Sequence, residues 1–204
     1  MTTQPDRSWS RSLATAAALG TCLALAMAPT ASAQREFPDD YFFNVNKPEL
    51  KAAHDEMTGQ PRPEFSIGDW INADLSAGDL EGKILIVDLW ATWCGPCLAA
   101  IPKNNDLAER YADQGVLVLG VCTSRGQEKL EQVVEQRDIQ YPVARDPDQQ
   151  TAEAWNVAFY PTYAVVDRKG IVRAIGLMPS RIEDVVKALL EEQPAETETA
   201  LQQD

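Results

Sequence analysis

Two nearly uninterrupted apolar runs mark the middle of the chain. Residues 84–90 (ILIVDLW) and 116–121 (VLVLGV) are rich in branched side chains, which is typical of strands covered on both faces. Shorter apolar runs at 162–166 and 171–175 flank the tetrapeptide Asp-Arg-Lys-Gly, a sequence that favours a tight turn. The pattern therefore predicts strands over all of these ranges, with the last two paired as a hairpin.

Segments with helical periodicity lie between and after these strands. Residues 96–112 begin with a proline, which favours a helix start, and contain Pro102, which predicts a kink. Residues 127–137 and 181–192 are amphipathic, and a short helical turn is expected at 151–155. Strands that alternate with helices, followed by a hairpin and a last helix, indicate an α/β fold with a central mixed sheet flanked by helices.

The first 33 residues have the pattern of an export signal. Arg7 and Arg11 precede an apolar run of about 15 residues, which is short of the roughly 20 that cross a bilayer. Ala31-Ser32-Ala33 then supplies the small residues that a signal peptidase requires. We expect cleavage after Ala33 and an extracytoplasmic location, periplasmic or secreted. An uncleaved membrane anchor is the alternative.

Composition divides the rest of the chain into three parts. Residues 34–62 carry several prolines and mixed charges, and we expect a loosely packed N-terminal extension with a short helix at 48–57. The compact domain is expected over residues 63–193, and the acidic, polar residues 194–204 are expected to form a disordered tail. The only histidine, His54, lies in the extension and is expected at the surface.

Charge and cysteine content narrow the possible functions. The 31 acidic and 18 basic residues give a formal net charge of −13. This excess repels phosphate backbones and anionic lipids, which argues against binding to nucleic acid or to a membrane surface. Removal of the signal leaves Cys94, Cys97 and Cys122 in a compartment where disulfides can form. Cys122 ends an apolar strand, and we expect a buried, inert thiol there.

Cys94 and Cys97 form a CxxC pair that follows the strand at 84–90 and opens the helix at 96–112. A thiolate at a helix start meets unpaired backbone N–H groups and the positive end of the helix dipole, which lower its pKa from about 8.5. We expect a partly exposed Cys94 to attack a substrate disulfide and a shielded Cys97 to resolve the mixed disulfide. A zinc site would need a second ligand pair, and we expect neither a metal nor an organic cofactor.

The segment 88–97 (DLWATWCGPC) resembles the active-site segment of the thioredoxin superfamily, and its flanks resemble the exported TlpA-like branch of that superfamily. Residues 82–83 (GK) before the first strand and 160–162 (YPT) before a later strand agree with that branch. The resemblance extends over residues 63–192. It implies a thioredoxin-like fold and thiol–disulfide oxidoreductase activity on protein thiols and disulfides.

The resemblance also implies roles for residues near the CxxC pair. Pro161 would form a cis peptide bond beside the redox disulfide. Together with Tyr160 it would hold a backbone edge toward an extended substrate strand. Trp93, Gly95 and Pro96 would complete the surface that contacts the substrate.

Asp88 lies inside an apolar strand, where a carboxylate is costly to bury unless its proton can come and go. The match to thioredoxin makes it a candidate general base for Cys97, with a pKa raised by desolvation. A carboxylate that reaches solvent at a strand edge is the alternative. Ala100 departs from the TlpA-like pattern, in which Glu is common three residues after the second cysteine, and this weakens a cytochrome-specific role.

The Gly-Pro dipeptide between the cysteines matches the reducing members of the superfamily. We therefore expect a reductase of protein disulfides, supplied with electrons by a transmembrane thiol donor. A disulfide-forming oxidase, a peroxiredoxin-type peroxidase and a non-catalytic binding module of the same fold are the alternatives. Ala91 stands where the peroxidase would need threonine, and the retained Cys94 and Cys97 argue against the non-catalytic module.

Overall fold

The computed structural model describes residues 37–192, and its centre is a mixed sheet with the strand order β1-β4-β3-β2-β5-β6. The strands are β1 (Trp70–Ile71), β2 (Ile84–Trp90), β3 (Val116–Thr123), β4 (Val143–Asp146), β5 (Thr162–Val166) and β6 (Val172–Leu177). β2, β3 and β4 are parallel to one another, whereas β1, β5 and β6 run antiparallel to their neighbours. The expected signal at 1–33 and the expected tail at 194–204 lie outside the described residues.

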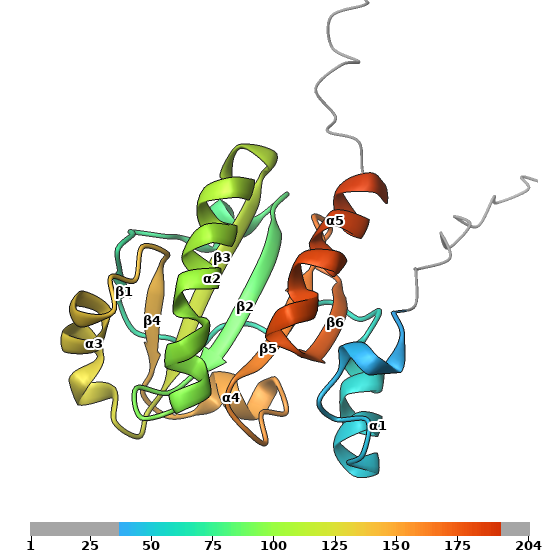
Figure 1. Ribbon diagram of the computed structural model, residues 1–204, viewed down its shortest axis with the longest axis horizontal. Coiled ribbons are helices and arrows are strands. Elements are labelled where there is room, and N and C mark those ends of the chain that lie inside the picture. Colours follow the sequence, from blue (N-terminus) through green and yellow to red (C-terminus); the bar gives the residue numbers. More distant parts are fainter. Residues whose placement is uncertain (1–36, 193–204) are drawn as a thin grey trace, which may run out of the picture. The chain divides into compact units, whose positions relative to one another are not determined.

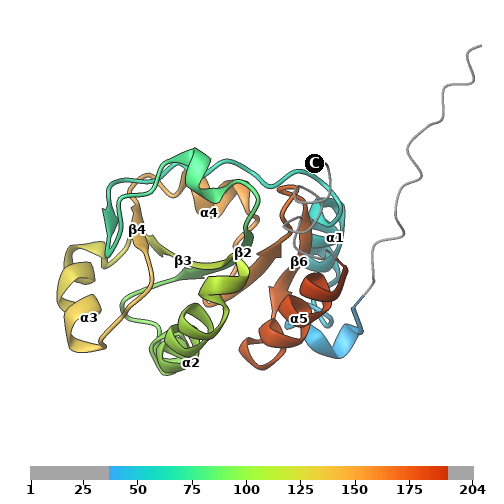
Figure 2. The ribbon, with the colours of Figure 1, turned by 90° about the horizontal axis from the view of Figure 1, so that it is seen from above.

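Helices cover both faces of this sheet (Figures 1 and 2). They are α1 (Pro48–Met57), α2 (Gly95–Tyr111), α3 (Leu130–Gln136), α4 (Gln150–Ala154) and α5 (Ile182–Glu192). α2, α3 and α5 lie on one face, while α4 and the segment 62–80 cross the other (Figure 2). The mixed sheet between helices confirms the predicted fold class.

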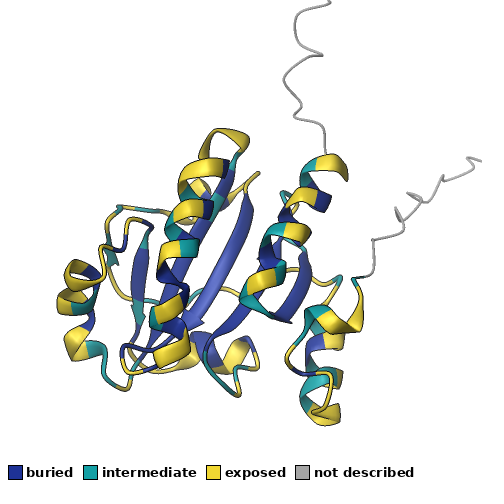
Figure 3. Ribbon diagram, viewed as in Figure 1, coloured by how far each residue is buried: buried dark blue, intermediate teal, exposed yellow. Residues whose placement is uncertain are grey.

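β2 is buried along its whole length because both faces of the sheet are covered (Figure 3). Successive side chains of a strand point to opposite faces. Ile84, Ile86 and Trp90 accordingly pack in the core under α2 and α5, and Leu85 and its alternate neighbours pack in the core under α4. The same alternation turns the side chain at position 88 toward α2.

Several elements differ from the sequence prediction. β1 and β4 were not predicted, and β6 runs to Leu177, two residues beyond the predicted end. The helix predicted at 127–137 is a 3₁₀ turn over Gln127–Lys129 followed by the shorter α3. β2, β5 and α1 have the predicted bounds.

The N-terminal extension is not loosely packed, and this expectation was wrong. α1 contacts β6, and isolated antiparallel bridges join Phe42 to Leu177 and Pro61 to Ile171. The prolines and mixed charges of this segment accompany a chain that lies along the edge strand β6 and hydrogen-bonds to it, because the N–H groups of Phe43 and Gly59 donate to the carbonyl oxygens of Gly176 and Val172.

His54 was expected at the surface, but it is only 1% exposed. The Asn44 amide lies 2.9 Å from Nδ1, and because an amide nitrogen donates, Nδ1 accepts and Nε2 carries the proton. Nε2 then donates to the carbonyl oxygen of Asn156 at 3.2 Å. Burial lowers the pKa of His54, which favours this neutral form. The histidine therefore ties the extension to the loop before β5.

Candidate active site

The carboxyl ends of β2 and β3 and the amino end of β5 lie side by side at the same end of the sheet. The strand register pairs Trp90 with Cys122 in β3 and Leu89 with Thr162 in β5. Cys94 lies in the turn that follows β2, and Pro161 is the residue immediately before β5. The CxxC motif and the Tyr160-Pro161-Thr162 motif that sequence analysis singled out therefore lie at the same end of the sheet.

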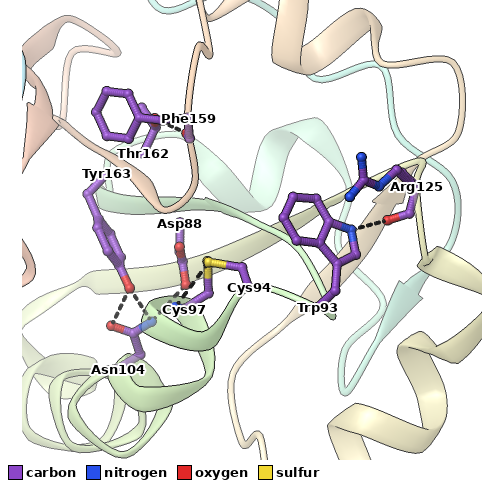
Figure 4. The surroundings of a disulfide bond; sticks show 9 residues. All are labelled: Asp88, Trp93, Cys94, Cys97, Asn104, Arg125, Phe159, Thr162 and Tyr163. Carbon is purple, nitrogen blue, oxygen red and sulfur yellow. Dashed lines mark hydrogen bonds between the residues drawn. A yellow bond between two sulfur atoms is a disulfide. The ribbon is translucent and has the colours of Figure 1, made fainter.

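Cys94 and Cys97 are joined by a disulfide at the start of α2 (Figure 4). Cys94 is the N-cap residue of this helix, and the backbone N–H of Cys97 donates to its Sγ at 3.2 Å. Cys97 is fully buried, as expected, but Cys94 is only 5% exposed rather than partly open. Its sulfur is bonded to Cys97 and packs in the same apolar cluster as Ala91, which leaves little of it at the surface.

Gly95 and Pro96, between the two cysteines, form the exposed first turn of α2. The Tyr160–Pro161 peptide bond is cis, as the resemblance implied. The Tyr160 ring meets the Trp93 ring edge to face, with 5.9 Å between the ring centroids. The CxxC segment and the cis-proline loop are thus in direct contact.

Trp93 is 49% exposed, and its orientation is fixed by the loop after β3. Its Nε1 donates to the Arg125 carbonyl at 2.9 Å, and the Thr92 hydroxyl donates to the Gly126 carbonyl at 2.8 Å. Gly126 has a φ of +84°, and a Cβ there would lie 2.7 Å from Thr92 Oγ1. Only glycine permits this close approach without strain. Sequence analysis missed Arg125, whose guanidinium lies 4.3 Å from the Trp93 ring centroid.

Asp88 is 1% exposed, which excludes the alternative of a carboxylate that reaches solvent. The Asn104 amide of α2 donates to Asp88 Oδ2 at 2.9 Å (Figure 4). Asp88 Oδ1 has no hydrogen-bond partner among residues 37–192. Burial raises the pKa of Asp88 to about 7, although the Tyr163 hydroxyl and the Asn104 amide favour the ionised form. This carboxyl group can therefore be protonated or ionised near neutral pH.

Asn104 connects Asp88 to two buried phenols that sequence analysis also missed. Its amide nitrogen lies 3.0 Å from the Tyr163 hydroxyl and 3.4 Å from the Tyr141 hydroxyl. Gly120 lies opposite Asp88 in β3, and a Cβ there would lie only 3.1 Å from the Tyr141 ring. The sequence did contain a signal for Asn104. This residue follows Cys97 by two helical turns, so it lies on the same face of α2, the face that packs against the sheet.

Cys122 is a fully buried free thiol, as expected. Burial raises its pKa to about 12, so its thiolate is scarce near neutral pH. Ala100 is buried beside the same core and brings no charge to the site. Within residues 37–192, no group of three or more His, Cys, Asp or Glu side chains is arranged to hold a metal ion. None of the helices in the described part of the chain is long and apolar enough to span a membrane.

Comparison with known proteins agrees with this geometry. The AhpC/TSA family matches residues 58–175. The thiol-disulfide oxidoreductase ResA of Geobacillus kaustophilus is 30% identical over 131 residues, which cover 64% of this chain and 75% of that protein. The thioredoxin-like protein YneN of Bacillus subtilis is 31% identical over 119 residues, or 57% of this chain and 69% of that protein.

A solved structure of similar fold is that of a thiol:disulfide interchange protein of the thioredoxin family from Chlorobium tepidum. It is 26% identical, with a TM-score of 0.56, and the match covers 64% of this chain and 95% of that chain. These relatives confirm the resemblance to the TlpA-like branch of the thioredoxin superfamily. The chain belongs to the AhpC/TSA family, and it is a thiol-disulfide oxidoreductase with a thioredoxin-like fold.

Proposed function

We propose that this protein is an exported reductase of protein disulfides, with the Cys94–Cys97 pair as its redox centre. The observation that carries the proposal is the position of this pair at the start of α2, in contact with the cis-proline loop through Trp93 and Tyr160. The Cys97 N–H that donates to Cys94 Sγ in the disulfide is available to stabilise a thiolate once the disulfide is reduced.

The exchange reaction transfers two electrons in two steps. The Cys94 thiolate attacks one sulfur of the substrate disulfide, a mixed disulfide forms, and the other substrate sulfur leaves as a thiolate that takes up a proton. Cys97 then loses its proton and attacks Cys94 Sγ. The mixed disulfide breaks, the second substrate thiol is released, and the Cys94–Cys97 disulfide forms. A dithiol donor outside this chain must then reduce the pair again.

Asp88 is the group that we assign to the proton of Cys97. A carboxyl group with a pKa of about 7 accepts and releases a proton at neutral pH. Its Oδ2 is held by Asn104, while Oδ1 has no partner among the described residues and remains available to accept a proton. Asp88 lies on the face of β2 that packs against α2, the helix that carries Cys97.

The remaining predicted site residues are assigned to the substrate. The cis bond before Pro161 supports the assignment of the adjacent Tyr160 backbone to an extended substrate strand. Gly95 and Pro96 are exposed at the helix start, and the Trp93 ring stands beside them at the surface. Gly95, next to Cys94, has no side chain and faces open space, which leaves room on that side for a substrate disulfide to approach.

The reducing direction and export are supported by the sequence. The Gly-Pro dipeptide between the cysteines favours a reductase, and Ala31-Ser32-Ala33 favours cleavage of an export signal. A reductase outside the cytosol has no soluble pool of reduced thiols to draw on. We therefore assign its electrons to a transmembrane thiol donor.

Disulfide-exchange assays and the reduction potential test this function. Reduced protein should reduce insulin disulfides, Cys94→Ser should abolish the reaction, and Cys97→Ser should accumulate a mixed disulfide with the substrate. The reduction potential of the pair should lie near that of thioredoxin, roughly −270 mV, rather than near the roughly −120 mV of a strong oxidant. A potential close to the second value would reverse the direction to an oxidase. Rapid consumption of hydrogen peroxide without insulin reduction would instead favour a peroxidase.

A further inference from the structure

Large apolar side chains are exposed at three positions in the described part of the chain. Trp93, Phe43 and Val45 are 49%, 45% and 40% exposed. Phe43 and Val45 belong to the N-terminal extension, which precedes the redox motif by some fifty residues in the sequence. Isolated exposed apolar residues need no explanation, but contiguous ones mark interaction sites.

Ring contacts connect the extension to the redox motif. Trp93 meets Tyr160 edge to face at 5.9 Å, and Phe43 meets Phe159 in the same way at 6.0 Å. Phe159 and Tyr160 are consecutive in the loop that leads into the cis-proline bond, so the backbone of that loop joins the two ring pairs, and we call these four rings the aromatic row. In Figure 4, Trp93 lies beside the disulfide, and Phe159 belongs to the loop that carries the cis-proline. The Trp93–Tyr160 end of the row therefore stands where a substrate disulfide must approach.

Hydrogen bonds hold the extension against this row. The Phe43 backbone N–H donates to the Gly176 carbonyl of β6 at 2.9 Å. The next residue, Asn44, is 2% exposed and hydrogen-bonds His54. His54 in turn donates to Asn156, in the loop that also carries Phe159. A surface that is already ordered loses little conformational entropy when a partner binds.

A positive charge lies at each end of the row. Lys47 Nζ is 4.5 Å from the Phe159 ring centroid, and the Arg125 guanidinium is 4.3 Å from the Trp93 ring centroid. Both side chains are exposed, and neither forms an ion pair with another residue between 37 and 192. Two cations that have no ion-pair partner in the described part of the chain contrast with the net charge of −13. They are complementary to an acidic partner.

We propose that residues 43–47 and 159–160, together with Trp93 and Arg125, dock an extended segment of the substrate protein in which apolar residues surround the cysteine and acidic residues lie further out. The apolar residues contact the aromatic row, and the acidic residues face Lys47 and Arg125. The inference rests on the proposed disulfide exchange and adds the class of substrate. The N-terminal extension is then part of the substrate site.

Model peptides test this preference directly. Each peptide carries one cysteine in a mixed disulfide with thionitrobenzoate, flanked by apolar residues and then by either glutamates or lysines. Reaction with the reduced protein releases the coloured thiolate, and its rate is measured. We expect the acidic peptide to react about threefold or more faster than the basic one, as for pairing of exposed charges.

Variants of the extension locate the effect. Lys47→Glu should remove or reverse the preference for the acidic peptide. Phe43→Ala should slow both peptides by about fivefold or more, as for loss of an aromatic contact in an interface. Lys169→Glu is the matched control, because Lys169 is exposed in the turn between β5 and β6, at the opposite end of β5 from the cis-proline loop. It makes the same change of charge and should leave the preference intact.

A small neutral disulfide separates this inference from the function on which it rests. Dithiodipyridine has neither a peptide segment nor a charge to dock, so it reports the exchange step alone, and wild type and the Lys169→Glu control should reduce it at the same rate. If wild type reacts with neither dithiodipyridine nor the peptides, the proposed exchange activity is wrong. If dithiodipyridine reacts but wild type treats both peptides alike, or the variants leave the preference unchanged, the docking surface is wrong. A dimer in sedimentation that Phe43→Ala dissociates would assign the row to a second copy and overturn the proposal.

Discussion

Asp88 is buried between β2 and α2, with one carboxylate oxygen hydrogen-bonded to Asn104 and the other without a partner among the described residues. None of the groups that shift its pKa carries a positive charge, so ionisation is opposed by desolvation and favoured only by neutral donors. Protonation therefore breaks no ion pair. This makes the carboxyl group suitable for repeated uptake and release of a proton.

Replacement of Asp88 by Asn should stabilise the protein in a pH-dependent way. Because the pKa of Asp88 is raised from 3.8 to about 7 on folding, the folded state disfavours its ionised form. No stability is lost below the unfolded value, and the penalty grows as the pH rises from 3.8 to about 7 and is constant above that. Asp88→Asn should thus raise the free energy of unfolding by about 2 to 4 kcal/mol near pH 8 and by about nothing near pH 3. Urea unfolding at both pH values measures the difference.

The same substitution tests the assigned proton transfer. Loss of a general base should slow multiple turnover of insulin by about tenfold or more, while the first attack by Cys94 on dithiodipyridine changes little. Stopped-flow measurement of the first step and steady-state measurement of turnover separate the two. Unchanged turnover combined with increased stability would leave Asp88 as a structural residue only.

Asn104 should set the pH at which Asp88 titrates. Asn104→Leu removes the donor to Asp88 Oδ2, and a hydrogen bond to a charged group is worth about 1.5 to 3 kcal/mol. The pKa of Asp88 should rise by about 1 or more. The pH profile of the turnover rate should therefore move to more alkaline pH. Tyr163→Phe should shift the profile in the same direction, because the Tyr163 hydroxyl also favours the ionised form. A lower activity with an unshifted profile would contradict this role.

The cysteines should differ widely in reactivity once the disulfide is reduced. Cys94 is the N-cap residue of α2 and the only cysteine among the described residues with measurable exposure, whereas Cys97 and Cys122 are fully buried. Burial also raises the pKa of Cys122 to about 12. Iodoacetamide near neutral pH should therefore modify Cys94 first, by about tenfold or more over the other two. Mass spectrometry of timed digests measures the order, and equal rates at Cys94 and Cys97 would contradict the assigned roles.

At the scale of secondary-structure elements, strands and helices with strong periodicity were predictable and short ones were not. β2 is a continuous apolar run because both sheet faces are covered, and its bounds were predicted from that run. β1 has only two residues, and β4 (VARD) ends in charged ones. The Asp146 carboxylate accepts the backbone N–H groups of Thr151 and Ala152 at the start of α4. The position of such a strand is set by the strands with which it pairs, and the local sequence does not show which strands these are.

The residues of the candidate site likewise fall into those that a local motif predicts and those that only the tertiary fold brings together. Cys94, Cys97, Trp93 and Pro161 belong to local motifs, and the sequence was sufficient to single them out. Asn104 and Tyr163 surround Asp88 only because α2 and β5 pack on either side of β2. Arg125 reaches Trp93 from a separate loop, and Phe43 reaches Phe159 across more than a hundred residues. These contacts follow from the tertiary fold.

Gly176 should be necessary for docking of the N-terminal extension. Its φ is +83°, and a Cβ there would lie 2.8 Å from His54 Nδ1 and 3.2 Å from the Asn44 amide. Gly176→Ala should therefore combine backbone strain with displacement of His54 and lower the free energy of unfolding by about 3 kcal/mol. Gly170→Ala is the matched control, because Gly170 has a φ of +78° with nothing within 4 Å of its Cβ position.

The control should show the backbone strain alone, about 1 kcal/mol. Urea unfolding gives both values, and limited proteolysis should cut Gly176→Ala between α1 and β1 faster than Gly170→Ala. Equal losses of stability and equal cleavage in the two variants would mean that the close approach of His54 is unimportant.

At the scale of the whole molecule, four segments that are far apart in the sequence meet at the same end of the sheet. The extension contributes Phe43, the segment after β2 contributes the disulfide, the loop after β3 contributes Arg125, and the loop before β5 contributes the cis-proline. A surface built from distant segments forms only in the folded protein. The order of its parts in the chain also means that any processing of the N-terminus must leave residues 43–47 in place for the proposed docking surface to exist.

Processing after Ala33 satisfies that condition, and we expect the exported protein to begin at Gln34. The apolar run that follows Arg11 is about 15 residues long, which suits a cleaved signal better than a span of roughly 20. Small side chains at Ala31 and Ala33 fit the peptidase, so Ala33→Tyr should block cleavage and leave the full-length chain at the membrane. N-terminal sequencing of the protein from the extracytoplasmic fraction of an expressing bacterium decides the point, with Ala100→Gly, inside the compact domain, as a variant that should be processed normally. Full-length wild-type protein retained in the membrane would instead support the anchor, and the reductase would then act from the membrane surface with the same docking segment attached.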